Sequence, residues 1–98
     1  LIREGAQLVT FDTYATYCVN APHVFASLIG PLLIERHPPI AMTWQASQVG
    51  IDVSLRSDGS VDVSELAKKY GGGGHTTSAG FTLPHGAPLP WVVTSHHS

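Results

Sequence analysis

The sequence is poor in charged residues, and above all in positive ones. Its 98 residues include five Lys or Arg against seven Asp or Glu, which gives a formal net charge of −2. Proteins that hold an extended nucleic-acid duplex rely on many Lys and Arg contacts that release counterions. Such a partner is therefore excluded, whereas a site that holds one or two phosphates with a single cation and backbone N–H groups stays open.

Cysteines, long apolar runs and a signal peptide are also missing. The single cysteine, Cys18, excludes an internal disulfide and suits a reducing compartment, so we expect a cytoplasmic protein. The longest apolar stretch, Val24 to Ile34, contains Ser27, Gly30 and Pro31 and is shorter than the ~20 residues of a membrane span, so no membrane partner is expected. The first residues carry neither an initiator Met nor a signal-peptide pattern, and we expect a piece of a longer protein.

Apolar residues make up 43% of the chain, which is enough for the core of one small domain over residues 1–98. Local patterns predict strands over Thr13–Asn20, Ile40–Ser47, Gly50–Ser57 and Gly80–Leu83, and helices over His23–Arg36 and Val63–Tyr70. Prolines predict an irregular tail over residues 84–98, outside a core of residues 14–83. The fold class is α/β, a small mixed sheet of about four to five strands with two helices packed on it and a glycine-rich loop at one edge.

The helix predicted over His23–Arg36 carries two sets of apolar residues at a spacing of four. They are Val24, Leu28 and Leu32 in one set, and Phe25, Ile29 and Leu33 in the other. This spacing predicts a broad apolar face that packs on the sheet. Pro31 follows Gly30 inside the helix and removes one backbone hydrogen bond, so we expect a kink or a break there.

Polar residues alternate with apolar ones in the strand predicted over Gly50–Ser57. A period of two places Asp52, Ser54 and Arg56 on the face opposite the apolar residues, so Arg56 should point to solvent or to a ligand. After the following turn, Asp62 is a helix N-cap, and Gly71 ends that helix.

Four consecutive glycines, Gly71–Gly74, precede His75 and form the most unusual stretch of the chain. Each extra glycine costs roughly 1 kcal/mol in chain entropy relative to Ala, so such a run is expected where the backbone comes close to another group. Consecutive N–H groups could bind an anion, with His75 and the next three side chains as further donors. A flexible turn or a tight corner between helix and strand explains the run equally well, because its spacing matches neither familiar phosphate-binding fingerprint.

An ordered set of motifs spans much of the chain. It consists of Ser54-Leu55-Arg56-Ser57, then Asp62-Val63 with Leu66-Ala67 and Tyr70, then Gly71-Gly72-Gly73-Gly74-His75, and finally Ala79-Gly80-Phe81. Together these motifs resemble the C-terminal DHH-associated domain, type 1, of DHH-superfamily phosphoesterases. The resemblance covers roughly residues 14–83, and its specific part is the glycine run followed by His.

The resemblance implies a binding domain and not a complete enzyme. In that family a separate N-terminal domain holds Asp and His ligands for two Mn²⁺ or Mg²⁺ ions, and the C-terminal domain closes over the cleft to hold the substrate. The expected substrate-binding residues are Arg56, Ser57, Gly72, Gly73, Gly74 and His75, of which Arg56 and His75 would contact a phosphate or the terminal nucleotide. No Asp-His-His stretch occurs, so we expect no catalytic residue, metal ligand or cofactor in this chain.

The resemblance also implies partners. They are a short single-stranded oligonucleotide or a (cyclic) dinucleotide as substrate, and the N-terminal DHH domain of the same protein, which as a whole would be a phosphohydrolase; a homodimer is left open. An alternative is a non-catalytic nucleic-acid-binding or dimerisation module, like the related C-terminal domain of alanyl-tRNA synthetases. That module has a glycine-rich run without a matching His, so His75 favours the phosphoesterase. Thr76-Thr77-Ser78 departs from the residues that more often follow the His, which bears on substrate choice.

Overall fold

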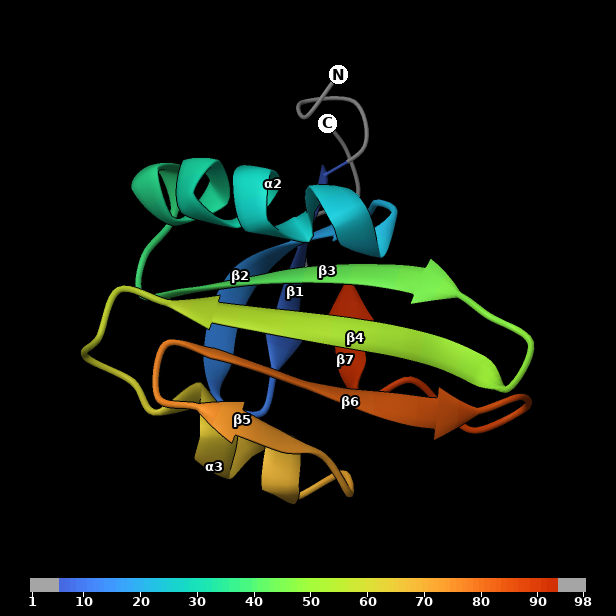
Figure 1. The fold of residues 1–98 in the computed structure, drawn as a ribbon. Helices are drawn as coiled ribbons and strands as arrows, with labels where there is room; N and C mark the ends of the chain where they lie inside the picture. Colours follow the sequence, from blue (N-terminus) through green and yellow to red (C-terminus); the bar gives the residue numbers. More distant parts are fainter. Residues whose placement is uncertain (1–5, 94–98) are drawn as a thin grey trace.

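The computed structural model of the chain describes residues 6–93, which form one seven-stranded sheet and two helices (Figure 1). The strands are β1 (Ala6–Phe11), β2 (Tyr14–Asn20), β3 (Ile40–Ala46), β4 (Gly50–Ser57), β5 (Gly73–His75), β6 (Ser78–Pro84) and β7 (Trp91–Val93). The helices are α2 (His23–Arg36) and α3 (Val63–Lys68). Across the sheet the strand order is β5-β6-β4-β3-β2-β1-β7.

The sheet is mixed, as predicted, because β2 and β3 are parallel and every other neighbouring pair is antiparallel. Parallel neighbours need a crossover, and α2 supplies it between β2 and β3. The prediction of four to five strands was wrong, since it left out β1, β5 and β7. The prediction of an irregular tail over residues 84–98 was also wrong at Trp91–Val93, because these residues form a strand that pairs with β1.

The sheet bends, so that β1, β2 and β7 pass behind β4 and β6 (Figure 1). Phe11 of β1 thereby stacks on Phe81 of β6, with ring centroids 6.1 Å apart, although these strands are not neighbours in the sheet. Tyr70, just beyond α3, contacts both rings. The larger core lies inside this bend, and α3 closes it with Val63, Leu66 and Ala67.

Helix α2 covers the other face of the sheet and runs through Pro31 without the expected break. It buries only part of the predicted apolar face. Leu33 is fully buried and Ile29 is half-buried against the sheet, whereas Val24, Phe25, Leu28 and Leu32 are all exposed. The other buried positions of the helix are the small residues Ala26 and Gly30, which let it approach the sheet closely.

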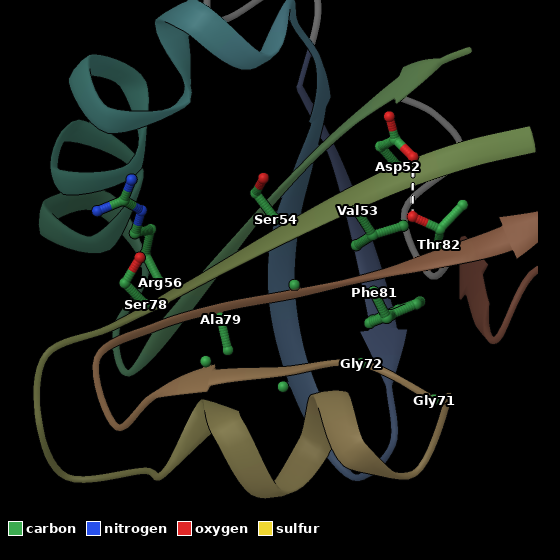
Figure 2. A pocket seen from close by; sticks show the side chains of 13 residues that line it. Asp52, Val53, Ser54, Arg56, Gly71, Gly72, Ser78, Ala79, Phe81 and Thr82 are labelled. Carbon is green, nitrogen blue, oxygen red and sulfur yellow. Dashed lines mark hydrogen bonds between the residues drawn. The ribbon is translucent and has the colours of Figure 1, made fainter. Parts of the chain in front are cut away.

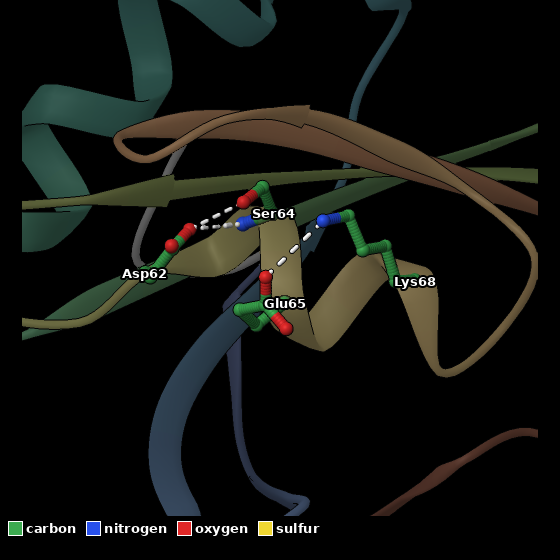
Figure 3. Close-up of polar contacts among 4 residues, drawn as sticks. All are labelled: Asp62, Ser64, Glu65 and Lys68. Atoms are coloured by element: carbon green, nitrogen blue, oxygen red, sulfur yellow. Dashed lines mark hydrogen bonds and ion pairs between the residues drawn. The ribbon is translucent and has the colours of Figure 1, made fainter.

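Helix α3 begins at the predicted cap. The side chain of Asp62 accepts hydrogen bonds from the backbone N–H and the hydroxyl of Ser64, which lower the pKa of the Asp62 carboxyl (Figure 3). Glu65 pairs with Lys68 at 3.2 Å on the exposed side of the helix. After the helix, Gly71 takes a positive φ of 87°, the backbone conformation that favours glycine at a helix end. No helix within residues 6–93 is long and apolar enough to cross a membrane.

Candidate functional site

A groove with a volume of about 680 Å³ lies over β4, β6 and β5, on the face of the sheet that carries α2 (Figure 2). Strand β4 contributes the side chains of Asp52, Ser54 and Arg56, the three polar residues that the alternation placed on one face. The turn and edge strand of the glycine run, Gly71–Gly74, form the opposite wall. The groove therefore brings together two of the motifs that the sequence singled out.

The strand register aligns these motifs in rows across the sheet. Arg56 is opposite Ser78 on β6, and Ser78 is in turn opposite His75 on β5. Residues directly opposite each other share a face of the sheet. Two strand spacings of about 4.8 Å place the backbones of Arg56 and His75 about 10 Å apart. A ligand over Ser78 would thus have Arg56 on one side and the exposed His75 beyond the rim on the other.

The connection between β5 and β6 is fixed by backbone hydrogen bonds to other elements. The N–H of Val63 at the start of α3 donates to the Thr76 carbonyl at 2.9 Å, and the N–H of Ser57 donates to the Thr77 carbonyl at 3.1 Å. The turn that follows His75 is therefore held by the end of β4 and by α3. This attachment fixes the position of His75 relative to Arg56.

Arg56 is a half-buried cation with no ion pair to any carboxylate within residues 6–93. Its aliphatic stem lies on Gly30 of α2, where a Cβ would come within 2.7 Å of Cγ of Arg56. Its Nε is buried and has no hydrogen-bond partner among the described residues. An unpaired buried donor is costly, and a guanidinium presents a fork of donors that suits a phosphate. Arg56 is thus positioned by α2 and lacks an anionic partner among residues 6–93.

Packing in the fold explains two of the three glycines at positions 72, 73 and 74. A Cβ on Gly72 would lie 2.0 Å from the carbonyl oxygen of Gly80, and one on Gly74 would lie 2.6 Å from Cα of Ala79. Gly73 has no positive φ, and a Cβ there would meet nothing within 4 Å. The glycine at position 73 is therefore not required by packing or by backbone conformation within the described residues.

The predicted site residues divide into two groups. Arg56, Gly72, Gly73 and Gly74 line the groove. His75 is not one of the lining residues, but it lies beyond the rim in the same row across the sheet as Arg56. The structure does not bring Ser57 to the groove. That residue is buried on the other face of β4, where its hydroxyl donates to the Val61 carbonyl at 2.6 Å and accepts from the N–H of Gly59 at 3.0 Å.

Sequence reasoning missed Thr82 of β6, which lines the groove, whereas Ser78 lines it as one of the donors expected after His75. The alternation along β4 placed Asp52 and Ser54 beside Arg56, but nothing in the sequence gave the register of β6 against β4. That register brings Ser78 opposite Arg56 and Thr82 opposite Asp52. The sequence therefore predicted that a strand forms here, but not that this strand lines the groove.

Other reactive side chains do not form a site in the described part of the chain. Residues 6–93 contain no cluster of three or more His, Cys, Asp or Glu that could hold a metal ion. Burial raises the pKa of the Cys18 thiol to about 12, so the thiol stays protonated and is a poor nucleophile at neutral pH. His85 lies beside the Gln48 carbonyl, with Nε2 at 2.9 Å from the oxygen.

Comparison with protein families decides the assignment, because the DHHA1 domain matches residues 17–90. The chain belongs to the DHHA1 family. A DHHA1 domain is associated with DHH-superfamily phosphoesterases, in agreement with the resemblance that the motifs showed. The match includes the whole groove, from β4 to β6.

A solved structure shares the fold of this chain. The crystal structure of an uncharacterized protein from Helicobacter pylori G27 superimposes with a TM-score of 0.58 at 22% sequence identity, over 84% of this chain. The matched part is 23% of the Helicobacter chain, so the DHHA1 chain spans about a quarter of that protein's length. No curated protein matches the chain.

Proposed function

We propose that this DHHA1 domain is the substrate-binding domain of a DHH phosphoesterase. It holds the terminal phosphate of a short single-stranded oligonucleotide or dinucleotide, while a DHH domain of the same protein performs metal-dependent hydrolysis of the phosphodiester. The observation that carries the proposal is the position of Arg56 on one wall of the groove, opposite the glycine run. Arg56 is a half-buried cation that forms no ion pair in the described part of the chain.

The groove suits one phosphate better than a long polyanion. Arg56 can donate two parallel hydrogen bonds to phosphate oxygens. The hydroxyl of Ser78 and a ring N–H of His75 lie in the same row and can donate to the same group. The net charge of −2 opposes tight binding along an extended strand. These features support recognition of a phosphorylated end.

In our proposal, bond cleavage belongs to another domain of the protein. A catalytic metal needs several fixed ligands, and residues 6–93 bring no such set together. The two Mn²⁺ or Mg²⁺ ions of the family therefore belong, in our proposal, to the DHH domain. The role of the DHHA1 chain is to bind and orient the substrate.

Calorimetric titration of the chain with dinucleotides tests the role of Arg56. The ligands carry a 5′-phosphate, a 3′-phosphate or neither. Arg56→Ala should weaken binding of one phosphorylated form by roughly 1.5–3 kcal/mol, the range for hydrogen bonds to charged groups, and leave the unphosphorylated form unaffected. Arg36→Ala is the matched control, because Arg36 is exposed at the end of α2 and its loss changes the net charge equally.

The double variant Arg56→Ala/His75→Ala tests whether both residues contact one phosphate. Two residues that share an anion should show a coupling energy above about 0.5 kcal/mol, whereas independent residues give additive losses. Equal losses for phosphorylated and unphosphorylated ligands would contradict the proposal. That outcome would favour the non-catalytic nucleic-acid-binding module instead.

A further inference from the structure

The groove has a second polar end, opposite in charge to the first. Asp52 precedes Arg56 by four residues on the same strand and faces the same side of the sheet. At about 3.3 Å per residue the two positions are about 13 Å apart along β4. A carboxylate at this end repels a phosphate, and Arg56 attracts one, so a nucleotide in the groove is oriented with its phosphate toward Arg56.

The carboxylate of Asp52 is held in place by its neighbour across the sheet. Thr82 is directly opposite Asp52, and its hydroxyl donates to Oδ1 of Asp52 at 2.9 Å (Figure 2). Asp52 forms no ion pair with any Lys or Arg within residues 6–93. An ionised carboxyl group only accepts hydrogen bonds, and Oδ2 remains available for a donor from the ligand. The end of the groove at Asp52 is therefore an acceptor site that prefers a hydroxyl or an amino group.

We propose that Asp52, oriented by Thr82, accepts a hydrogen bond from the 2′-hydroxyl of the ribose that carries the phosphate. This inference rests on the proposed binding of a phosphate at Arg56. The separation of about 13 Å between the two backbone positions has room for the phosphate and ribose of one nucleotide with a hydrogen bond at each end. Asp52 is then the residue that distinguishes ribonucleotides from deoxyribonucleotides, because the 2′-hydroxyl is the group that differs between them.

The test compares 5′-phosphorylated ApA with its 2′-deoxy counterpart in calorimetric titrations of the chain. The unvaried chain should bind the ribo form roughly tenfold more tightly, the effect of one hydrogen bond to a charged group. Asp52→Ala should reduce this preference to less than about twofold while the dependence on the phosphate is kept. Glu35→Ala is the matched control, since it removes an exposed carboxylate of α2 and should retain the tenfold preference.

The outcomes separate this inference from the proposed function. Equal affinity of the unvaried chain for ribo and deoxy forms, or an undiminished preference in Asp52→Ala, overturns the role of Asp52 even if the phosphate is still required. Binding that ignores the phosphate but retains a ribo preference dependent on Asp52 overturns the proposed function of Arg56 alone. Failure of both forms to bind overturns both proposals.

Discussion

The glycines at positions 72, 73 and 74 differ in what a methyl group on each would meet. Gly72 and Gly74 lie against β6, so their missing side chains are a packing requirement. Gly73 lies between them in sequence with open space above it. The three positions cannot be told apart in the sequence. Substituting Gly72 and Gly73 separately distinguishes a role in packing from a role in binding.

Gly73→Ala should leave the free energy of unfolding unchanged or slightly higher, because an added methyl group meets no atom and restricts the unfolded chain. It should nevertheless weaken binding of a phosphorylated dinucleotide, since it fills the wall of the groove. Gly72→Ala should cost about 1–3 kcal/mol of stability through overpacking against Gly80 and Phe81. Denaturant titration and calorimetric titration measure the two effects. Full binding by a stable Gly73→Ala chain would show that no ligand approaches this position.

For single residues, the sequence predicts a side chain's direction when that direction follows from its own strand or helix, and not when it depends on a contact between elements. The outward direction of Arg56 follows from the period of one strand and was predictable. The contact of Arg56 with Gly30 joins β4 to α2, and the position of Ser78 depends on the register of β6 against β4. No pattern in the sequence of one element predicts either of these features. Ser57 has a polar side chain beside Arg56, yet the same period of two directs it to the other face, where it holds a turn.

Helix α2 shows that apolar side chains in a helical pattern need not face the sheet. Its ends were predictable, because Pro22 and Pro38-Pro39 limit the helix on both sides. Its buried face was predictable only in part, because that face depends on the shape of the surface beneath it. Leu33 packs with Ala21 and Ala41 as predicted, but Gly30 is needed where the helix meets the Arg56 stem. Leu28, which is 66% exposed, consequently lies on the outside.

Leu33→Ala should cost about 2–5 kcal/mol in the free energy of unfolding, because Leu33 is 0% exposed and its loss leaves a cavity. Leu28→Ala should change it by less than about 0.5 kcal/mol, since the side chain is already in water and Ala is a strong helix former. Denaturant unfolding followed by circular dichroism measures both. A large loss of stability in Leu28→Ala would mean that the outer face of α2 is covered by something in solution.

On the scale of the whole molecule, the pairing of β1 with β7 joins the two ends of the described chain. β7 is a short strand of three residues, but its Trp91 packs against the larger core while Val92 is exposed. The sequence did not predict this strand, because several prolines precede it and its stability comes from a partner about eighty positions away. Non-local pairing of this kind leaves no pattern within a short window.

Trp91→Ala should destabilise the domain by about 1–3 kcal/mol, because it removes a large side chain that packs on the core next to β1. Val92→Ala, at a position that is 68% exposed on the same strand, should have an effect of less than about 0.5 kcal/mol. The midpoint of thermal unfolding ranks the two variants. Equal midpoints would show that β7 does not contribute to the core.

The pairing of β1 with β7 also bears on the rate at which the domain opens. The hairpins β1–β2 and β3–β4 close short loops, whereas β7 can pair only after almost the whole chain has been brought together. Closing a long loop costs entropy before its contacts are gained, so such a strand joins late in folding. Interactions absent from the folding transition state act on the unfolding rate. We therefore expect Trp91 to govern how slowly the folded domain unfolds and to have little influence on how fast it forms.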